Sequence, residues 1–312
     1  MGQDILQVMV TPEYLHETRA FGYWSLPAKN GNDTQKYLED QINSYISFYQ
    51  TNIETQRWYG FWNYGDVMHS YDPNRHCWNY DAGGKAWHNT ELETDLWLWY
   101  SFIRTGRADI YRMATAMTRH TSEVDAYHIG DMKGLGTRHN VIHWGCGAKE
   151  ARVGQAWWKR MCFYLTTDDR LGDVMTESLA ANEAMLDFDS LVRAQPRSQY
   201  PTEKPTRLRW GPDWTSLVGN WFTQWERTGD KYCLDMINAG MNSLSDKKNL
   251  PNGLFTGKGY AFGYDPATGI ITYEGDPEWT VSSNGVAQWT LEAIILQDLI
   301  GEYIPDLKDI KR

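Results

Sequence analysis

The chain has 312 residues, of which 41% are apolar and 22% charged, which is the composition of a globular protein. Its net charge of −10 would repel a phosphate backbone, so nucleic acid is not expected as a partner. No apolar run is long enough to cross a bilayer, so no membrane partner is expected either.

Apolar residues recur at helical spacing along most of the chain. In "DWTSLVGNWFTQWERTG", for example, Trp214, Leu217, Trp221 and Trp225 follow one another at steps of three or four, with Val218 beside them, and so share a helix face. The same pattern predicts eight main helices, at residues 36–58, 87–105, 108–124, 150–166, 169–187, 214–228, 230–245 and 282–300.

Six of these helices form a repeat of pairs. The segments "LWLWYSFIRTGRADIYRMATAM", "AWWKRMCFYLTTDDRLGDVMTESL" and "GNWFTQWERTGDKYCLDMINAGM" each break once, after threonines that lie 62 and 61 residues apart. Repeats of this length are typical of stacked helical hairpins. Gly106 and Gly229 can adopt the left-handed conformation that ends a helix, and Asp168 tolerates it, so we expect tight turns there.

Long connections separate the hairpins. Residues 60–86, 125–149, 188–213 and 246–281 are rich in Gly, Pro, Tyr and Trp, and loops of this length usually carry function. Since the tight turns of stacked hairpins lie at one end, the long connections should meet at the other end, the rim. We therefore expect one all-α domain over residues 1–312, a six-hairpin-type (α/α) toroid, complete or incomplete, with strands expected only in a hairpin within residues 253–275.

The histidines gather in one quarter of the sequence. Seven of the eight lie between His69 and His143, and ordinary core packing does not produce that distribution. His139 and His143 could bind zinc if they shared a helix face, but the glycines around them make a regular helix doubtful, so we expect no metal site. The sequence requires no cofactor and leaves a divalent cation open. The four cysteines lack CxxC spacing and are expected to be free or singly bridged.

Cationic, neutral-base and aromatic side chains dominate the rim of this acidic protein. Arginine binds carboxylates and aromatic rings stack on sugars, which together predict an acidic oligo- or polysaccharide containing uronic acid as the partner. For β-elimination, a neutral histidine suits the base, either His139 or His143, with Arg138 and Lys149 neutralising the carboxylate and Tyr71 or Tyr264 as the acid. The remaining predicted substrate-binding residues are His69, His76, Trp87, His88, Glu91, Trp144, Glu150, Arg207, Arg209 and Trp210.

Other interpretations remain open for several of these residues. Glycoside hydrolysis would need a carboxylate pair, for which Glu91, Glu150, Asp213 and Glu274 are candidates. A non-catalytic glycan-binding module is the third hypothesis. Individual side chains also have structural interpretations: His120 as a cation at a helix C-terminus, and the helix-borne tryptophans as core residues. Cys146 beside a histidine is a weaker candidate nucleophile.

Three long motifs resemble one known family. "FWNYGDVMHSYDPNRHCWNYDAGGKAWHNTELETDLWLWYSFIRTGR", "MTRHTSEVDAYHIG" and "GTRHNVIHWGCGAKEARVGQA" are similar to the toroid domain of exo-acting rhamnogalacturonan lyases and their bacterial YetA-like relatives. The resemblance is strong over residues 20–190. It implies an α/α toroid and a lyase that cleaves the rhamnose–galacturonate backbone of pectin from a chain end. It also implies a secreted, periplasmic or cell-surface protein, and β-rich domains that precede the toroid.

Overall fold

The computed structural model describes residues 9–60, 67–68, 71–78, 87–88, 94–137, 149–151, 156–192, 196–198, 201–209, 213–245, 261–272, 286–303 and 306–309. Within these ranges the protein is mostly helical. The helices are α1 (Pro12–Glu17), α2 (Asp33–Gln56), α3 (Thr94–Thr105), α4 (Ala108–Glu123), α5 (Ala156–Thr166), α6 (Asp169–Glu177), α7 (Ala180–Ala184), α8 (Thr215–Thr228), α9 (Lys231–Ser245) and α10 (Val286–Ile300). Two short 3₁₀ helices follow, at Gly301–Tyr303 and Leu307–Asp309.

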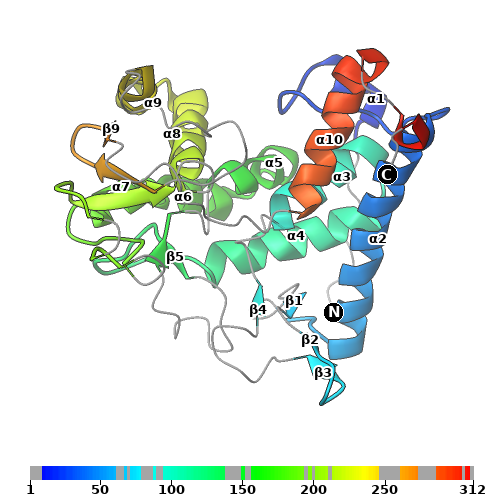
Figure 1. The fold of residues 1–312 in the computed structure, drawn as a ribbon, viewed down its shortest axis with the longest axis horizontal. Helices are drawn as coiled ribbons and strands as arrows, with labels where there is room; N and C mark the ends of the chain where they lie inside the picture. The colour runs from blue at the N-terminus through cyan, green and yellow to red at the C-terminus, as the bar shows by residue number, and fades with distance from the viewer. Residues whose placement is uncertain are drawn as a thin grey trace.

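The helices pack as a row of antiparallel pairs. Helix α3 pairs with α4, α5 with α6 and α8 with α9, while α2 pairs with α10 from the other end of the chain. Neighbouring pairs touch through α10 and α3, α3 and α5, and α5 and α8. Figure 1 shows α2 and α10 at one end of this row and α8 and α9 at the other. This arrangement agrees with the expected helical hairpins.

The tight turns follow local sequence, with one difference. Gly106 and Gly229 take positive φ angles of 66° and 72°, as expected, because glycine has no Cβ to clash there. In the α5–α6 turn the positive φ, 55°, belongs to Thr167. Asp168 is extended instead and accepts a hydrogen bond from the backbone N–H of Arg170, so it begins α6 rather than ending α5.

Two helices begin later than predicted, and a third predicted helix is divided into two shorter ones. Helix α3 begins at Thr94 rather than 87, because Trp87 and His88 form strand β4 (Trp87–His88) opposite β1 (Val67–Met68). Helix α5 begins at Ala156 rather than 150, because residues 149 and 150 form a strand. The helix predicted at 169–187 is interrupted at Ser178, whose hydroxyl donates to the carbonyl of Met175.

Short strands occupy the connections. Strand β2 (Tyr71–Asp72) pairs with β3 (Cys77–Trp78), and β5 (Gly136–Thr137) pairs with β6 (Lys149–Glu150). A three-stranded antiparallel sheet is built from β7 (Thr206–Arg209), β8 (Ala261–Asp265) and β9 (Ile270–Thr272). The β8–β9 hairpin lies within the segment predicted to form one, whereas its pairing with β7 was not expected from the sequence.

Two apolar clusters hold these elements together. The first joins α2, α3, α4, α5 and α10 around Trp97, Trp99 and Ile110, and the second joins α8, α9 and the β7–β9 sheet around Trp221 and Phe262. Each of these five side chains is at most 1% exposed. Most helix-borne tryptophans are therefore packing residues, as expected. Cys162 and Cys233 are buried free thiols. In the part of the chain that the structure describes, no helix is long and apolar enough to span a membrane.

Gly134 fixes the second connection against the helices. Its φ is +84°, and a Cβ placed on it would lie 2.3 Å from the backbone nitrogen of Ala181 at the start of α7. Gly130 in the same loop has φ +77° but nothing within 4 Å of a Cβ. Both glycines therefore have a positive φ that disfavours other residues, but only Gly134 also lies against the backbone of another segment.

This pair gives a matched test of the loop's anchoring. We expect Gly130→Ala to lower the free energy of unfolding by about 1 kcal/mol through backbone strain alone. Gly134→Ala should cost about 2 kcal/mol more, because the added methyl must displace the backbone of α7. Urea unfolding of both variants measures the difference. Equal destabilisation would show that the contact with Ala181 relaxes freely.

Candidate functional site

Both ends of the basic segment, residues 138–148, are held at one place. Gly136 pairs with Glu150 and Thr137 with Lys149 in the antiparallel β5–β6 ladder, so the segment leaves and returns between adjacent strands. The loop before it is also closed: the N–H of Tyr127 donates to the carbonyl of Leu135, the N–H of Gly134 donates to the carbonyl of Tyr127, and Ala126 bridges to Gly136. The segment itself, with Arg138, His139, His143 and Trp144, lies outside the described residues, but its two attachment points are defined.

A buried ion cluster anchors this hairpin to the next connection. Arg209 of β7 donates from Nη2 to Oε2 of Glu150 at 2.7 Å and from Nε to Oδ2 of Asp213 at 2.7 Å. The Glu150 and Asp213 side chains are 0% exposed and that of Arg209 is 4% exposed. Burial alone would lower the pKa of Arg209, but Asp213 and Glu150 raise it above its ordinary value. We call these three residues the Arg209 cluster.

The Arg209 cluster joins connections that are far apart in the sequence. Glu150 ends the second connection and Arg209 and Asp213 end the third. The fourth connection joins them because β8 pairs with β7 along its whole length. In Figure 1, β5 lies at one end of α4, and the β1–β4 pair of the first connection lies below the same helix. The basic segment therefore starts beside a buried ion cluster that three connections share.

Arg207 was predicted to bind substrate, and the structure places it inside the protein. It is 1% exposed, and its Nε donates to Oδ2 of Asp189 at 2.9 Å. Arg197 contacts the same carboxylate oxygen at 2.8 Å. Arg207 and Arg209 thus both contact carboxylates of the protein. These contacts stabilise the sheet and leave neither guanidinium exposed to a glycan.

Tyr264, one of two candidate acids, also lies in the core. Its side chain is 0% exposed and its hydroxyl donates to Oδ1 of Asn182 at 2.6 Å. Burial raises the pKa of Tyr264 well above its ordinary value. A phenol in this position stays protonated and has no open side toward a sugar, which leaves Tyr71 as the remaining candidate acid.

The other predicted site residues are only partly described. Tyr71 lies in β2, Trp87 and His88 in β4 and Lys149 in β6, each defined by its backbone pairing. His76 is exposed in the β2–β3 turn at φ 51°. His69, Glu91 and Trp210, together with the candidate carboxylate Glu274 and the candidate nucleophile Cys146, lie outside the described residues.

A second cluster of buried charged residues lies where α3 and α5 begin and α4 ends, and it was not expected from the sequence. Lys159 and Asp95 are both 0% exposed, as are His120 and Asp125. Burial lowers the pKa of Lys159 to about 8, while the charges of Asp95 and Asp125 oppose that shift. Burial raises the pKa of Asp95, whose Oδ2 accepts the hydroxyl of Thr121 at 2.9 Å. A charged residue inside "TDLWLW" and another inside "AWWKRMC" were the signals that could have revealed it.

Two histidines turn out to be bound to carboxylates. His120 was interpreted as a helix C-terminal cation; it does lie in the last turn of α4, with Nε2 3.5 Å from Oδ1 of Asp125. His128 Nδ1 lies 2.6 Å from Oε2 of Glu177, in a surface network with Arg170. Among the described residues, no group of three or more His, Cys, Asp or Glu side chains could hold a metal ion.

Comparison with known proteins places this architecture in a family. The model of a family described as "PcRGLX-like protein C-terminal alpha/alpha toroid domain" matches residues 6–283. The chain is also 47% identical over 270 residues to a Bacillus subtilis (strain 168) protein named "Uncharacterized protein YetA". That alignment covers 86% of this chain and 30% of the relative, so the chain spans about a third of the relative's length.

Proposed function

Because this chain belongs to the family of PcRGLX-like C-terminal α/α toroid domains, we propose that it is a polysaccharide lyase acting on a uronate-containing pectic glycan. The family is related to rhamnogalacturonan-lyase-like enzymes, which suggests a pectin-related role. The proposed substrate is a rhamnogalacturonan-like chain, attacked from its end. Since such polymers lie outside the cell, we place the protein in a secreted or cell-surface location.

The observation that carries the proposal is the anchoring of the basic segment. The β5–β6 pairing and the Arg209 cluster fix both of its ends, and pre-organised groups are what a site for charge stabilisation needs. The segment contains two histidines, an arginine and a tryptophan, and Lys149 follows it directly. These residue types suit the base and the charge-stabilising roles in a uronate lyase.

The proposed reaction is a β-elimination. Arg138 and Lys149 pair with the uronate carboxylate and make the neighbouring C5 proton removable. A neutral His139 or His143 takes that proton. As the C5–H bond breaks, a C4=C5 double bond forms and the C4–O bond to the leaving sugar breaks. Tyr71 donates the proton that the leaving oxygen requires, and Trp87 and Trp144 form the stacking surface.

Two of the four carboxylates that were candidates for hydrolysis are poorly placed for it, which supports elimination. Glu150 and Asp213 both contact Arg209 and are 0% exposed, so neither is placed to protonate a glycosidic oxygen or to activate water beside a sugar. Glu91 and Glu274, which lie outside the described residues, remain the candidates for hydrolysis.

One assay separates the three functions. The protein is incubated with rhamnogalacturonan while ultraviolet absorbance at the unsaturated-uronate band is followed, and released sugar is measured in parallel. We expect absorbance and reducing ends to rise together. Sugar release without an absorbance gain would identify a hydrolase. Calorimetric binding of the polymer with neither signal would identify a binding module.

A further inference from the structure

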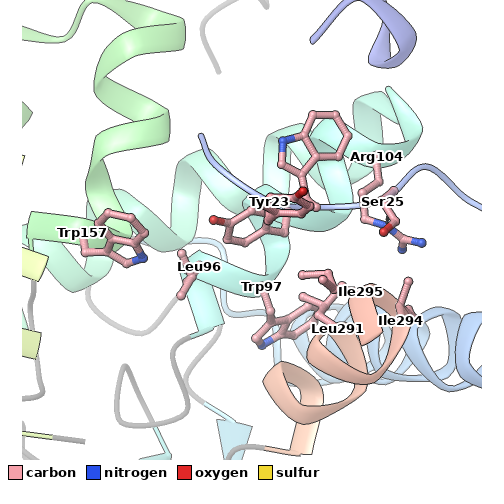
Figure 2. A pocket seen from close by; sticks show the side chains of 11 residues that line it. Tyr23, Ser25, Leu96, Trp97, Arg104, Trp157, Leu291, Ile294 and Ile295 are labelled. Atoms are coloured by element: carbon pink, nitrogen blue, oxygen red, sulfur yellow. Dashed lines mark hydrogen bonds between the residues drawn. The ribbon is translucent and has the colours of Figure 1, made fainter. Parts of the chain in front are cut away.

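A cavity of about 220 Å³ lies away from the Arg209 cluster, between α3, α10, the segment at residues 23–25 and the start of α5. Figure 2 shows Trp157 at one end and Ser25 with Arg104 at the other, while Leu291 and Ile294 of α10 form one side. None of its lining residues belongs to the proposed lyase machinery.

The walls offer apolar surface of two kinds. Leu291 and Ile294 are aliphatic, whereas Tyr23, Trp97 and Trp157 present aromatic rings. Trp157 is held in place by Arg160, whose guanidinium carbon lies 4.0 Å from the ring centroid, and by Phe222 at 5.8 Å. Flat, fixed rings opposite aliphatic side chains suit a ligand with apolar faces.

The cavity also contains hydrogen-bonding groups that are not used. In the described part of the chain, the hydroxyls of Tyr23 and Ser25 and the indole N–H groups of Trp97 and Trp157 make no hydrogen bond. The hydroxyl of Tyr100, by contrast, donates to the carbonyl of Phe21 at 3.1 Å. A ligand that both stacks and carries hydroxyl groups would satisfy these donors.

The charge of the cavity argues against an anionic ligand. Arg104 is its cation, and its Nε donates to the carbonyl of Ser25 at 2.5 Å, while both terminal nitrogens contact Glu39. The side chain is 2% exposed, so the guanidinium is already satisfied inside the protein. A carboxylate entering this space would find no free cation among the lining residues.

We propose that this cavity binds a neutral pyranose. Its rings and aliphatic side chains contact the C–H faces of the sugar, and the free hydroxyl and indole donors contact the sugar hydroxyls. The ligand class rests on the proposed function, because the backbone that carries uronates also carries neutral sugars. The cavity is then a second subsite that selects the uncharged residue.

Ligand-detected NMR titration with L-rhamnose, using D-galacturonate as the charged comparator, tests this subsite. The intact chain should bind L-rhamnose saturably and at least tenfold more tightly than D-galacturonate. Tyr23 is 62% exposed, so Tyr23→Ala should leave thermal unfolding unchanged while weakening L-rhamnose binding by roughly 2- to 10-fold. Ile294→Trp fills the cavity and should abolish binding. Tyr303→Ala is the control, since Tyr303 is 79% exposed and lies outside the cavity.

Three outcomes would overturn the proposal: no saturable binding of L-rhamnose, equal affinity in Tyr23→Ala and the unaltered chain, or equally tight binding of D-galacturonate. The measurement involves no turnover, so it fails separately from the lyase proposal. Binding of L-rhamnose without formation of unsaturated product would support this subsite and contradict the lyase. Unsaturated product without L-rhamnose binding would contradict the subsite alone.

Discussion

Alanine at His139 or at His143 is expected to lower turnover of rhamnogalacturonan by about 10²- to 10⁴-fold in one of the two variants, which is the range over which a general base contributes. The effect should fall on one variant because only one imidazole can lie beside the C5 proton. Both histidines belong to the basic segment, whose ends are fixed at β5 and β6. Initial rates from the ultraviolet assay measure the change.

The control for this pair is His16→Ala. His16 lies far from the basic segment in the sequence; it belongs to α1, where its ring packs edge-on against Trp24 at 5.3 Å. We expect this variant to retain its rate. All three variants should unfold at similar temperatures, so that a lost rate reports chemistry rather than folding. Full activity in both His139→Ala and His143→Ala would refute the assignment of the base to this segment.

Arg209→Ala is expected to lower the free energy of unfolding by about 3–5 kcal/mol, the usual cost of removing one partner from a buried ion pair. The reason is that Glu150 and Asp213 would remain buried without their cation. The cluster also fixes the exit of the basic segment, so the same variant should lose lyase activity. Urea unfolding and the ultraviolet assay measure the two effects.

Arg107→Ala is the matched control for this substitution. Arg107 contacts Asp109 at 2.7 Å, the same distance as in the Arg209 cluster, but the two side chains are 40% and 39% exposed. Solvent screens such a pair, and we expect a loss of at most about 1 kcal/mol with unchanged activity. If both variants were destabilised equally, burial would not be what makes the Arg209 cluster important.

The helical hairpins could be predicted because their causes are local. Repeating apolar residues define the helix faces, and Gly106 and Gly229 end helices through their own conformational freedom. Trp87 and His88 form a strand where a helix was predicted, because they pair with Val67 and Met68. These partners lie about 20 residues earlier, so the local sequence around position 87 does not reveal the pairing. Backbone pairing of this kind overrides helical periodicity.

The candidate site was only partly predictable for a related reason. Glu150, Arg207 and Arg209 were identified as functional because charged side chains in aromatic connections are typical of glycan sites. In the structure, Arg209 forms an ion pair with Glu150, which lies 59 residues earlier in the sequence, and Arg207 forms one with Asp189. Lys159 and Asp95 were missed because they lie in helices whose periodicity favours core packing.

The sequence alone determined the helical pairs, their tight turns, the family and the chemical character of the connections, because each depends on residue types and on spacing along the chain. Only the tertiary structure decided which charges remain available to a ligand. Arg104, Arg207 and Arg209 are all cations in the sequence, yet each contacts a carboxylate that lies outside its own helix or strand. Charge is a property of a residue, whereas its neutralisation depends on which residues the fold places within hydrogen-bonding distance.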